Sequence, residues 1–230
     1  ALRGGYGVYY IQTLLGIKQN EAFNNPPFSQ RLTIGNTSFD DPGIVVPATS
    51  HTPLVIYGNR PDWTIPYSQS WSLDVQQQFS KNGVVDIGYY GNKGTHLLGA
   101  IDLNQPHAGA YAQQGIIPGT VVTPATSTLL NQIRPYKGYG TMNYVEPIFT
   151  SNYNALQLSV KQQFARDSEV GLNYTWSNAL ANSLSDRSNP PQDIYNIKAE
   201  YGPTTYNRTN VLHLNFVYTL PFFREQQRFV

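Results

Sequence analysis

The sequence predicts an all-β fold, an antiparallel up-and-down transmembrane β-barrel segment with about six long strands and long external loops. Three observations predict it. Apolar side chains recur at every second residue over long stretches, short and long connections alternate along the chain, and only 13% of the 230 residues are Asp, Glu, Lys or Arg. That charged fraction is about half of the value typical of soluble domains.

Composition also excludes several classes of protein. The 15 basic and 14 acidic residues leave a net charge of +1, so nucleic acid is not an expected partner. The absence of cysteine excludes a disulfide framework and thiolate metal chemistry. No apolar run is long enough for a transmembrane helix, and the chain opens without Met or a leader, so we expect a mature or truncated piece.

The first strand pair follows from an alternation that only one amide, Gln77, interrupts. Trp71, Leu73, Val75 and Phe79 alternate with polar residues, which is the period of a strand with two different faces. A turn-type sequence at 80–83 separates this stretch from a second alternating stretch, 84–96. The two stretches therefore predict a β-hairpin.

The same hairpin recurs 85 residues later without a gap, and the outermost stretches of the chain alternate in the same way. We therefore predict six strands, and the connections between them differ in length. The strands are expected near residues 1–11, 68–80, 84–96, 153–165, 169–180 and 208–220. Two joins have about four residues, whereas 12–66, 97–145 and 181–206 are long loops, so an up-and-down order puts all long loops at one end.

The apolar parity carries no Lys, Arg, Asp or Glu in any of the six stretches. A lipid-facing surface explains this, since a charge at the bilayer midplane costs about 2–4 kcal/mol. Phe79, Phe164, Phe222 and Phe223 near the short turns, and Trp71 and Trp176 towards the long loops, would form two interfacial girdles. The alternative is a soluble β-sandwich or β-helix, which also alternates but usually has a wet face rich in Lys and Glu.

Six strands are too few for a closed transmembrane barrel, since the smallest bacterial barrels have about eight. We therefore expect an internal fragment, with residues 228–230 opening a seventh strand and with the plug and remaining barrel absent. The isolated chain is not expected to fold stably, because both terminal strands would lack partners.

Several sequence motifs resemble those in the barrel of TonB-dependent receptors, in particular the large Oar-like group with a carboxypeptidase-regulatory-like domain that is abundant in Acidobacteria. These motifs are Arg3–Tyr10, Tyr67–Leu73, Gly88–Leu97, Ser151–Gln157, Asn207–Thr209 and Tyr218–Phe222. The resemblance spans nearly the whole chain. Relatives commonly have Asp-Arg-His at the motif Asn207–Thr209, where this chain has Asn207 and Thr209 beside Arg208.

The resemblance implies a 22-stranded receptor in the bacterial outer membrane that takes up a ligand with TonB-coupled energy. Its partners would be outer-membrane lipid, the plug of the same full-length chain, the TonB complex, and a small ligand, glycan or peptide. A passive porin or surface adhesin on the same barrel, or a soluble extracellular β-rich structural or binding protein, remains an alternative. No enzyme activity, cofactor or metal is expected.

The candidate site residues fall into two groups. The polar parity would face the lumen, where plug contact is favoured over substrate contact: Arg3, Asp74, Gln76, Gln78, Asp86, Gln157, Lys161, Gln163 and Asn173. Loop aromatics suited to ligand recognition are Trp63, Tyr111, Tyr136, Tyr139 and Tyr144, although simple loop packing would also explain them.

Other reactive residues read as structural. The histidines His51, His96, His107 and His213 lie far apart and lack the spacing of zinc ligands. The pair Asp40-Asp41 precedes Pro-Gly and is better explained as a turn than as a calcium site. No Gly-x-Ser-x-Gly elbow is present, so hydrolase chemistry is not predicted.

Overall fold

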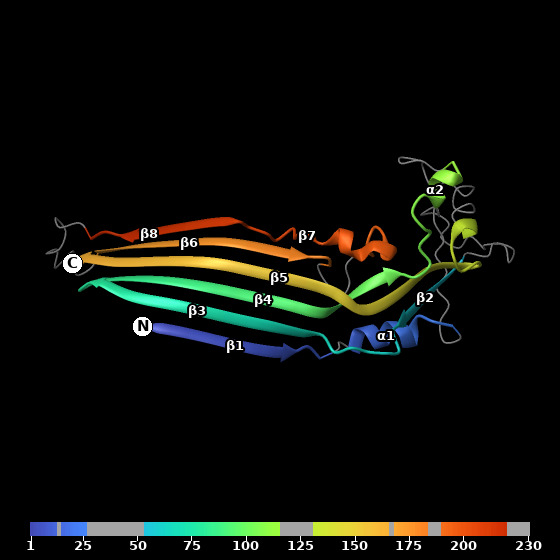
Figure 1. The fold of residues 1–230 in the computed structure, drawn as a ribbon, viewed down its shortest axis with the longest axis horizontal. Helices are drawn as coiled ribbons and strands as arrows, with labels where there is room; N and C mark the ends of the chain where they lie inside the picture. Colours follow the sequence, from blue (N-terminus) through green and yellow to red (C-terminus); the bar gives the residue numbers. More distant parts are fainter. Residues whose placement is uncertain (13–14, 27–52, 116–130, 166–167, 184–189, 220–230) are drawn as a thin grey trace, which may run out of the picture.

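The computed structural model consists of one β-sheet with short helices gathered at one end (Figure 1). The structure describes residues 1–12, 15–26, 53–115, 131–165, 168–183 and 190–219. None of the helices in these ranges has the length and apolar character needed to cross a membrane.

Six long strands cross the sheet in chain order. They are β1 (Leu2–Tyr10), β3 (Tyr67–Ser80), β4 (Gly83–Asp102), β5 (Tyr139–Ala165), β6 (Ser168–Ala181) and β8 (Asn210–Val217). Each pairs antiparallel with the next, and within the described residues β1 and β8 do not pair with each other, so the sheet is open. The predicted all-β, antiparallel, up-and-down architecture is confirmed.

The hairpin repeat seen in the sequence is also a repeat of backbone geometry. The β3–β4 ladder shifts register between Gln78 and Ser80, and the β5–β6 ladder shifts between Gln163 and Ala165, which is the same place in the repeat. A bulge of this kind bends and twists the strand just before it turns. Both short connections are therefore built in the same way.

Strands β4 and β5 are longer than their alternation predicts. The stretches 97–102 and 139–145, expected within a long loop, are strand and pair with each other, as Asp102 with Asn143 and Ile101 with Tyr144. At about 3.4 Å per residue, the 27 residues of β5 extend over roughly 90 Å, and they are more than twice the roughly 9–11 residues with which a strand crosses a bilayer. The outer parts of β4 and β5 thus continue far beyond a membrane-spanning length.

A distortion in β4 explains why the alternation gave no sign of this extension. The β4–β5 register shifts between Gly94 and Leu97 and again between Leu97 and Gly99. Between these shifts His96 has φ of 55°, a left-handed conformation uncommon for a residue with a side chain. Two register shifts within six residues end the period of two, although the chain continues as strand.

The other stretches expected as long loops contain further elements. They are α1 (Leu15–Phe23), β2 (Leu54–Asn59), α2 (Ala110–Gln113), the 3-10 helix η1 (Ile194–Glu200) and β7 (Gly202–Pro203). Strand β2 pairs parallel with the outer part of β5, and β7 pairs with β6. Parallel pairing between segments about 85 residues apart leaves no local signal in the sequence.

The free edge of β2 is covered at one residue. The Asn25 side chain donates from Nδ2 to the Tyr57 carbonyl at 2.6 Å and accepts from the Tyr57 backbone N–H at 2.8 Å. An amide side chain bound in this way takes the place of a neighbouring strand. Strand β2 therefore exposes less unpaired backbone than an ordinary edge strand would.

The sheet has almost no core of its own. Among the described residues the buried hydrophobic side chains are only Ile101, Phe149 and Ala155, and the first two belong to the outer parts of β4 and β5. Close packing is thus concentrated at the outer end. The predicted seventh strand at 228–230, and Leu220, Phe222 and Phe223, lie outside the described residues.

Candidate functional site

One face of the sheet is apolar and uncovered. Leu73 is 54% exposed, Val75 49%, Leu214 65% and Phe216 73%, and no second layer covers them within the described part of the chain. In water, covering these side chains would stabilise the sheet by roughly 25 cal/mol for each Å² of apolar surface removed from the solvent. A continuous uncovered apolar face therefore requires an apolar surrounding.

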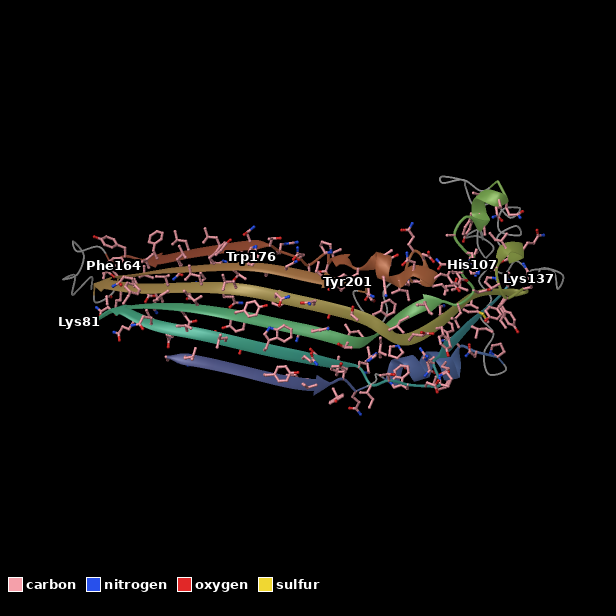
Figure 2. The ribbon with its side chains drawn as sticks, in the orientation of Figure 1. Lys81, His107, Lys137, Phe164, Trp176 and Tyr201 are labelled. Atoms are coloured by element: carbon pink, nitrogen blue, oxygen red, sulfur yellow. The ribbon has the colours of Figure 1, made fainter. Side chains whose placement is uncertain are left out.

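Aromatic side chains lie towards the two ends of this apolar face, measured along the strands. Phe79 and Phe164 are each 55% exposed beside the two short connections, and Trp176, also 55% exposed, lies part-way along the sheet (Figure 2). Trp71 pairs opposite Gly91 and covers it. Eight residues separate Phe79 from Trp71, about 27 Å along the strand, which for a tilted strand is near the height of a barrel's apolar band.

Two amides interrupt the apolar parity near the short connections. Gln77 and Gln162 occupy the same place in the repeat, and each donates from Nε2 to the carbonyl of the next residue at 2.9 Å. Gln162 also accepts a hydrogen bond from the Ser80 hydroxyl at 3.0 Å. Their polar groups are thus partly satisfied at the end of the face, where water is near.

The opposite face is polar because the strand registers align its polar residues. Arg3 pairs with Asp74, Gln76 with Asp86, and Asp86 with Ser159, which in turn pairs with Asn173. A hollow of about 620 Å³ opens on this side and is lined from five neighbouring strands. The polar residues that line this hollow are those that would face the lumen if the sheet were part of a barrel.

Seven of the nine residues predicted to face the lumen line this hollow. They are Arg3, Asp74, Gln76, Asp86, Gln157, Lys161 and Asn173. Gln78 and Gln163 have the same strand parity but lie nearer the short connections and do not line it. Gln78 instead donates to the Lys81 carbonyl at 3.0 Å, next to the turn.

Several groups on the polar face are already bonded to each other. Arg3 donates to Gln76 Oε1 at 3.1 Å, and Lys161 lies 3.1 Å from Glu169. The Tyr90 hydroxyl donates to Asp74, and its ring passes over Gly88, whose missing side chain leaves the room for it. The polar parity indicated the place of Tyr90, but nothing in the sequence indicated its partner.

The predicted loop aromatics are spread over the outer end rather than gathered. Tyr139 and Tyr144 lie on β5, so the expectation that they belong to an irregular loop is wrong, because the β4–β5 ladder continues past its bulges. Tyr111 is on α2, Tyr136 precedes β5, and Trp63 lies between β2 and β3. Among the described residues no ring contact joins two of these five.

Tyr144 is more enclosed than Tyr139, the other predicted loop aromatic that lies on β5. Its ring lies 3.0 Å from the place a side chain at Gly58 would take, so it packs on β2. Burial raises the pKa of its phenol, and the nearby Glu146 carboxylate raises it further. The Tyr144 phenol is therefore neutral, and its ring serves to pack β5 against β2. Tyr136 and Tyr139 are 54% and 39% exposed and are open to solvent.

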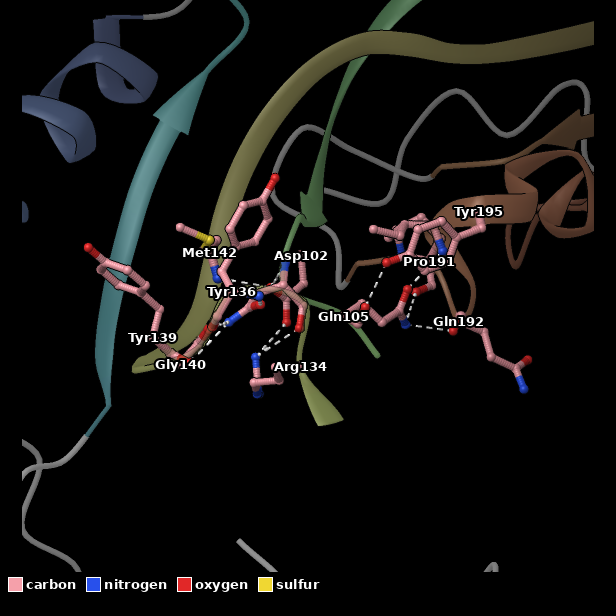
Figure 3. Close-up of polar contacts among 12 residues, drawn as sticks. Asp102, Gln105, Arg134, Tyr136, Tyr139, Gly140, Met142, Pro191, Gln192 and Tyr195 are labelled. Carbon is pink, nitrogen blue, oxygen red and sulfur yellow. Dashed lines mark hydrogen bonds and ion pairs between the residues drawn. The ribbon is translucent and has the colours of Figure 1, made fainter. Parts of the chain in front are cut away.

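A hydrogen-bond network at the end of β4 organises this outer region (Figure 3). Asn104 is fully buried; its amide donates to the carbonyls of Tyr136, Tyr139 and Gly140 at 2.8–3.1 Å and accepts from the Tyr136 N–H at 2.7 Å. Asp102 accepts from the Met142 N–H at 2.8 Å and lies 3.4 Å from Arg134. These side-chain to backbone bonds have no periodic signature, so no pattern in the sequence predicts them.

No metal site is evident in the part of the chain that the structure describes, since no three His, Asp or Glu side chains gather there. His96 lies on β4, His107 between β4 and α2, and His213 on β8. His51 and the Asp40-Asp41 pair lie outside the described residues. The arrangement offers hydrogen-bonding and aromatic surfaces for binding.

The comparison with known families agrees with this geometry. A family model described as an outer membrane beta barrel domain matches residues 1–230. No curated protein and no solved structure matches the chain.

Proposed function

The chain belongs to the outer membrane beta barrel domain family and is located in the bacterial outer membrane, and from this premise we propose that it is the barrel segment of a TonB-dependent receptor. In this proposal the receptor resembles the Oar-like group, its barrel has 22 strands, and it imports a ligand with energy supplied through TonB. No covalent chemistry is proposed for the chain. The family assignment replaces the soluble alternatives considered above.

The uncovered apolar face fits the family assignment directly. Its leucines, valines and aromatics contact acyl chains, and the bands of Phe and Trp lie near the two interfaces. The short connections then lie at the periplasmic side, and the outer parts of β4 and β5, with β2, α1 and η1, lie outside the cell (Figure 1). This orientation follows the usual sorting of short turns and long loops.

The single observation that carries the receptor proposal is the polar face with its hollow of about 620 Å³. Two cationic side chains, Arg3 and Lys161, and two carboxylates, Asp74 and Asp86, line it together with amides and hydroxyls. A balanced set of donors and acceptors suits contact with a folded polypeptide, as a plug domain would be. We assign the face to the plug rather than to the ligand for that reason.

The outer end supplies the surface for ligand capture in this proposal. Tyr136 and Tyr139 expose their rings there, and the buried Asn104 holds the backbone of both through hydrogen bonds. Exposed tyrosines on a fixed base provide contact area at a low entropic cost. The ligand class stays open among siderophores, glycans, peptides and vitamins.

A paired measurement on the full-length protein tests the receptor proposal. Binding of the periplasmic domain of TonB to the detergent-solubilised protein is measured first, and then ion conductance in planar bilayers. A plugged, TonB-coupled receptor should bind the domain and show no steady conductance. Steady single-channel steps without TonB binding would instead establish the passive porin.

A further inference from the structure

Two outer segments that are far apart in the chain meet at Gln105. The first, residues 103–115, follows β4, and the second, residues 190–201, contains η1 and lies between β6 and β8. Figure 3 shows Gln105 between the Asp102 network on one side and Pro191, Gln192 and Tyr195 on the other. No strand pairing connects the two segments, so their side chains decide whether they stay together.

Gln105 uses its whole side-chain amide on the second segment. Nε2 donates to the Gln192 carbonyl at 2.7 Å and to the Pro191 carbonyl at 3.4 Å, and Oε1 accepts from the Ile194 N–H at 2.8 Å. The Tyr195 hydroxyl adds a bond of 2.9 Å to the Gln105 carbonyl. One residue thus makes four polar contacts to a segment 86–90 positions away. We call this set of bonds the Gln105 contact.

A ring stack lies beside the Gln105 contact. The rings of His107 and Tyr195 have centroids 4.0 Å apart and planes inclined by 19°. Tyr195 therefore binds the first segment twice, through its ring face and through its hydroxyl. Pro106, next to Gln105, and Pro191, whose carbonyl accepts from Gln105, are both buried.

The first segment is fixed more firmly than the second. Gln105 follows the buried Asn104, and its own backbone N–H donates to the Asp102 carbonyl at 2.9 Å. The second segment attaches to the sheet through the short β7 pairing, where Thr204 N–H donates to the Ala179 carbonyl at 3.0 Å. Within the described residues, the Gln105 contact is thus the main link between residues 191–195 and the rest of the outer end.

We propose that Gln105 and Tyr195 hold the two outer segments together as one unit, so that any molecule displacing residues 191–195 must first break the Gln105 contact. This goes beyond uptake, because it concerns the coupling of two outer segments and holds for any ligand or for none. The proposed coupling would keep the exposed Tyr195 ring at a fixed place relative to Tyr136.

Hydrogen exchange of the full-length protein in detergent micelles tests the coupling without a ligand or TonB. The reporter is the Ile194 amide, which is bonded to the Gln105 side chain. In Gln105→Ala we expect its exchange to rise at least about tenfold, while the Thr204 and Met142 amides, bonded to Ala179 and Asp102, stay unchanged. The matched control is Gln113→Ala, an exposed glutamine on α2.

Tyr195→Phe provides an independent variant, because it removes the hydroxyl bond and keeps the ring for the stack on His107. We expect a smaller rise at Ile194, roughly threefold, again confined to residues 191–200. An Ile194 exchange rate within about twofold of the native protein in Gln105→Ala would overturn the proposal. If Gln105→Ala also raises the exchange rate of the Met142 amide, the result for Tyr195→Phe decides. A higher exchange rate of the Ile194 amide in Tyr195→Phe then supports the coupling, and an unchanged rate overturns it.

Discussion

Trp71 in β3 lies directly opposite Gly91 in β4, and its indole ring occupies the space that a side chain at residue 91 would need. The ring thus covers a bare stretch of backbone on the apolar face. In hydrocarbon an uncovered peptide group has no water to bind, so a large aromatic beside a glycine protects the ladder. Trp71 therefore belongs to the aromatic band and also stabilises the pairing of β3 with β4.

Replacing Gly91 by Ala should therefore destabilise the folded protein. The new methyl group meets the Trp71 ring, which must leave its position, and overpacking of this kind costs about 1–3 kcal/mol. The midpoint of heat-modifiable gel migration of the full-length protein should fall. Gly5→Ala is the control, since its new methyl group would find its nearest neighbour, the Ser72 hydroxyl, at an ordinary 3.7 Å. Equal midpoints for the two variants would contradict this account of the pair.

Neighbouring residues on β5 should respond in opposite ways to a charge. Val160→Arg puts a cation on the apolar face between Val85 and Leu172 and should cost about 2–4 kcal/mol in a bilayer. Ser159→Arg places the same cation on the polar face, opposite Asp86, and should be tolerated. Chemical unfolding of the full-length protein in lipid vesicles measures both. Similar losses for the two variants would show that the faces are assigned wrongly.

The Tyr90 hydroxyl bonded to Asp74 should contribute measurably to stability. Tyr90→Phe keeps the ring over Gly88 and removes the donor, so we expect a loss of about 1 kcal/mol in the free energy of unfolding. Tyr9→Phe is the control, because that hydroxyl has no hydrogen bond within the described residues and the side chain is 62% exposed. An unchanged denaturation midpoint in Tyr90→Phe would mean that water replaces the bond at no cost.

The bond between Tyr195 and Gln105 should persist into alkaline solution. Stacking on His107 leaves the side chain 48% exposed, but partial burial still raises the pKa of its phenol above the usual value, and the Asp193 carboxylate adds to the rise. A raised pKa favours the neutral donor in the folded state. Its stabilising contribution is thus complete below about pH 10 and is lost as pH rises through the higher folded value. The phenolate absorbance difference between the native protein and Tyr195→Phe should have its midpoint above 10, and a midpoint below 10 would contradict the burial.

The sheet could be predicted because one physical constraint governs its middle section. Between Trp71 and Phe79 the odd residues other than Gln77 are apolar and the even residues are polar, so the period of two is almost unbroken. Strand pairing then fixed which polar residues meet, and seven of the nine residues expected to face the lumen line one hollow.

The outer end could not be predicted because different forces hold it. Past the bulges around His96, strand residues no longer separate an apolar solvent from water, so β4 and β5 continue without alternation. Strand β2 is a short apolar run that pairs parallel with distant residues. Asn104 and Gln105 act through backbone carbonyls and N–H groups far along the chain, and such partners have no pattern in sequence.

Spin labels placed singly at residues 156–164 of β5 test most directly what surrounds the apolar face. In the full-length protein reconstituted in bilayers, labels at even positions should be accessible to oxygen dissolved in lipid, and labels at odd positions, on the face assigned to the plug, should be less accessible to it. Oxygen accessibility should therefore alternate with a period of two, while a water-soluble nickel reagent should not reach the even positions. Labels at even positions shielded from both reagents would contradict the account, because a second protein layer would then cover the face assigned to lipid.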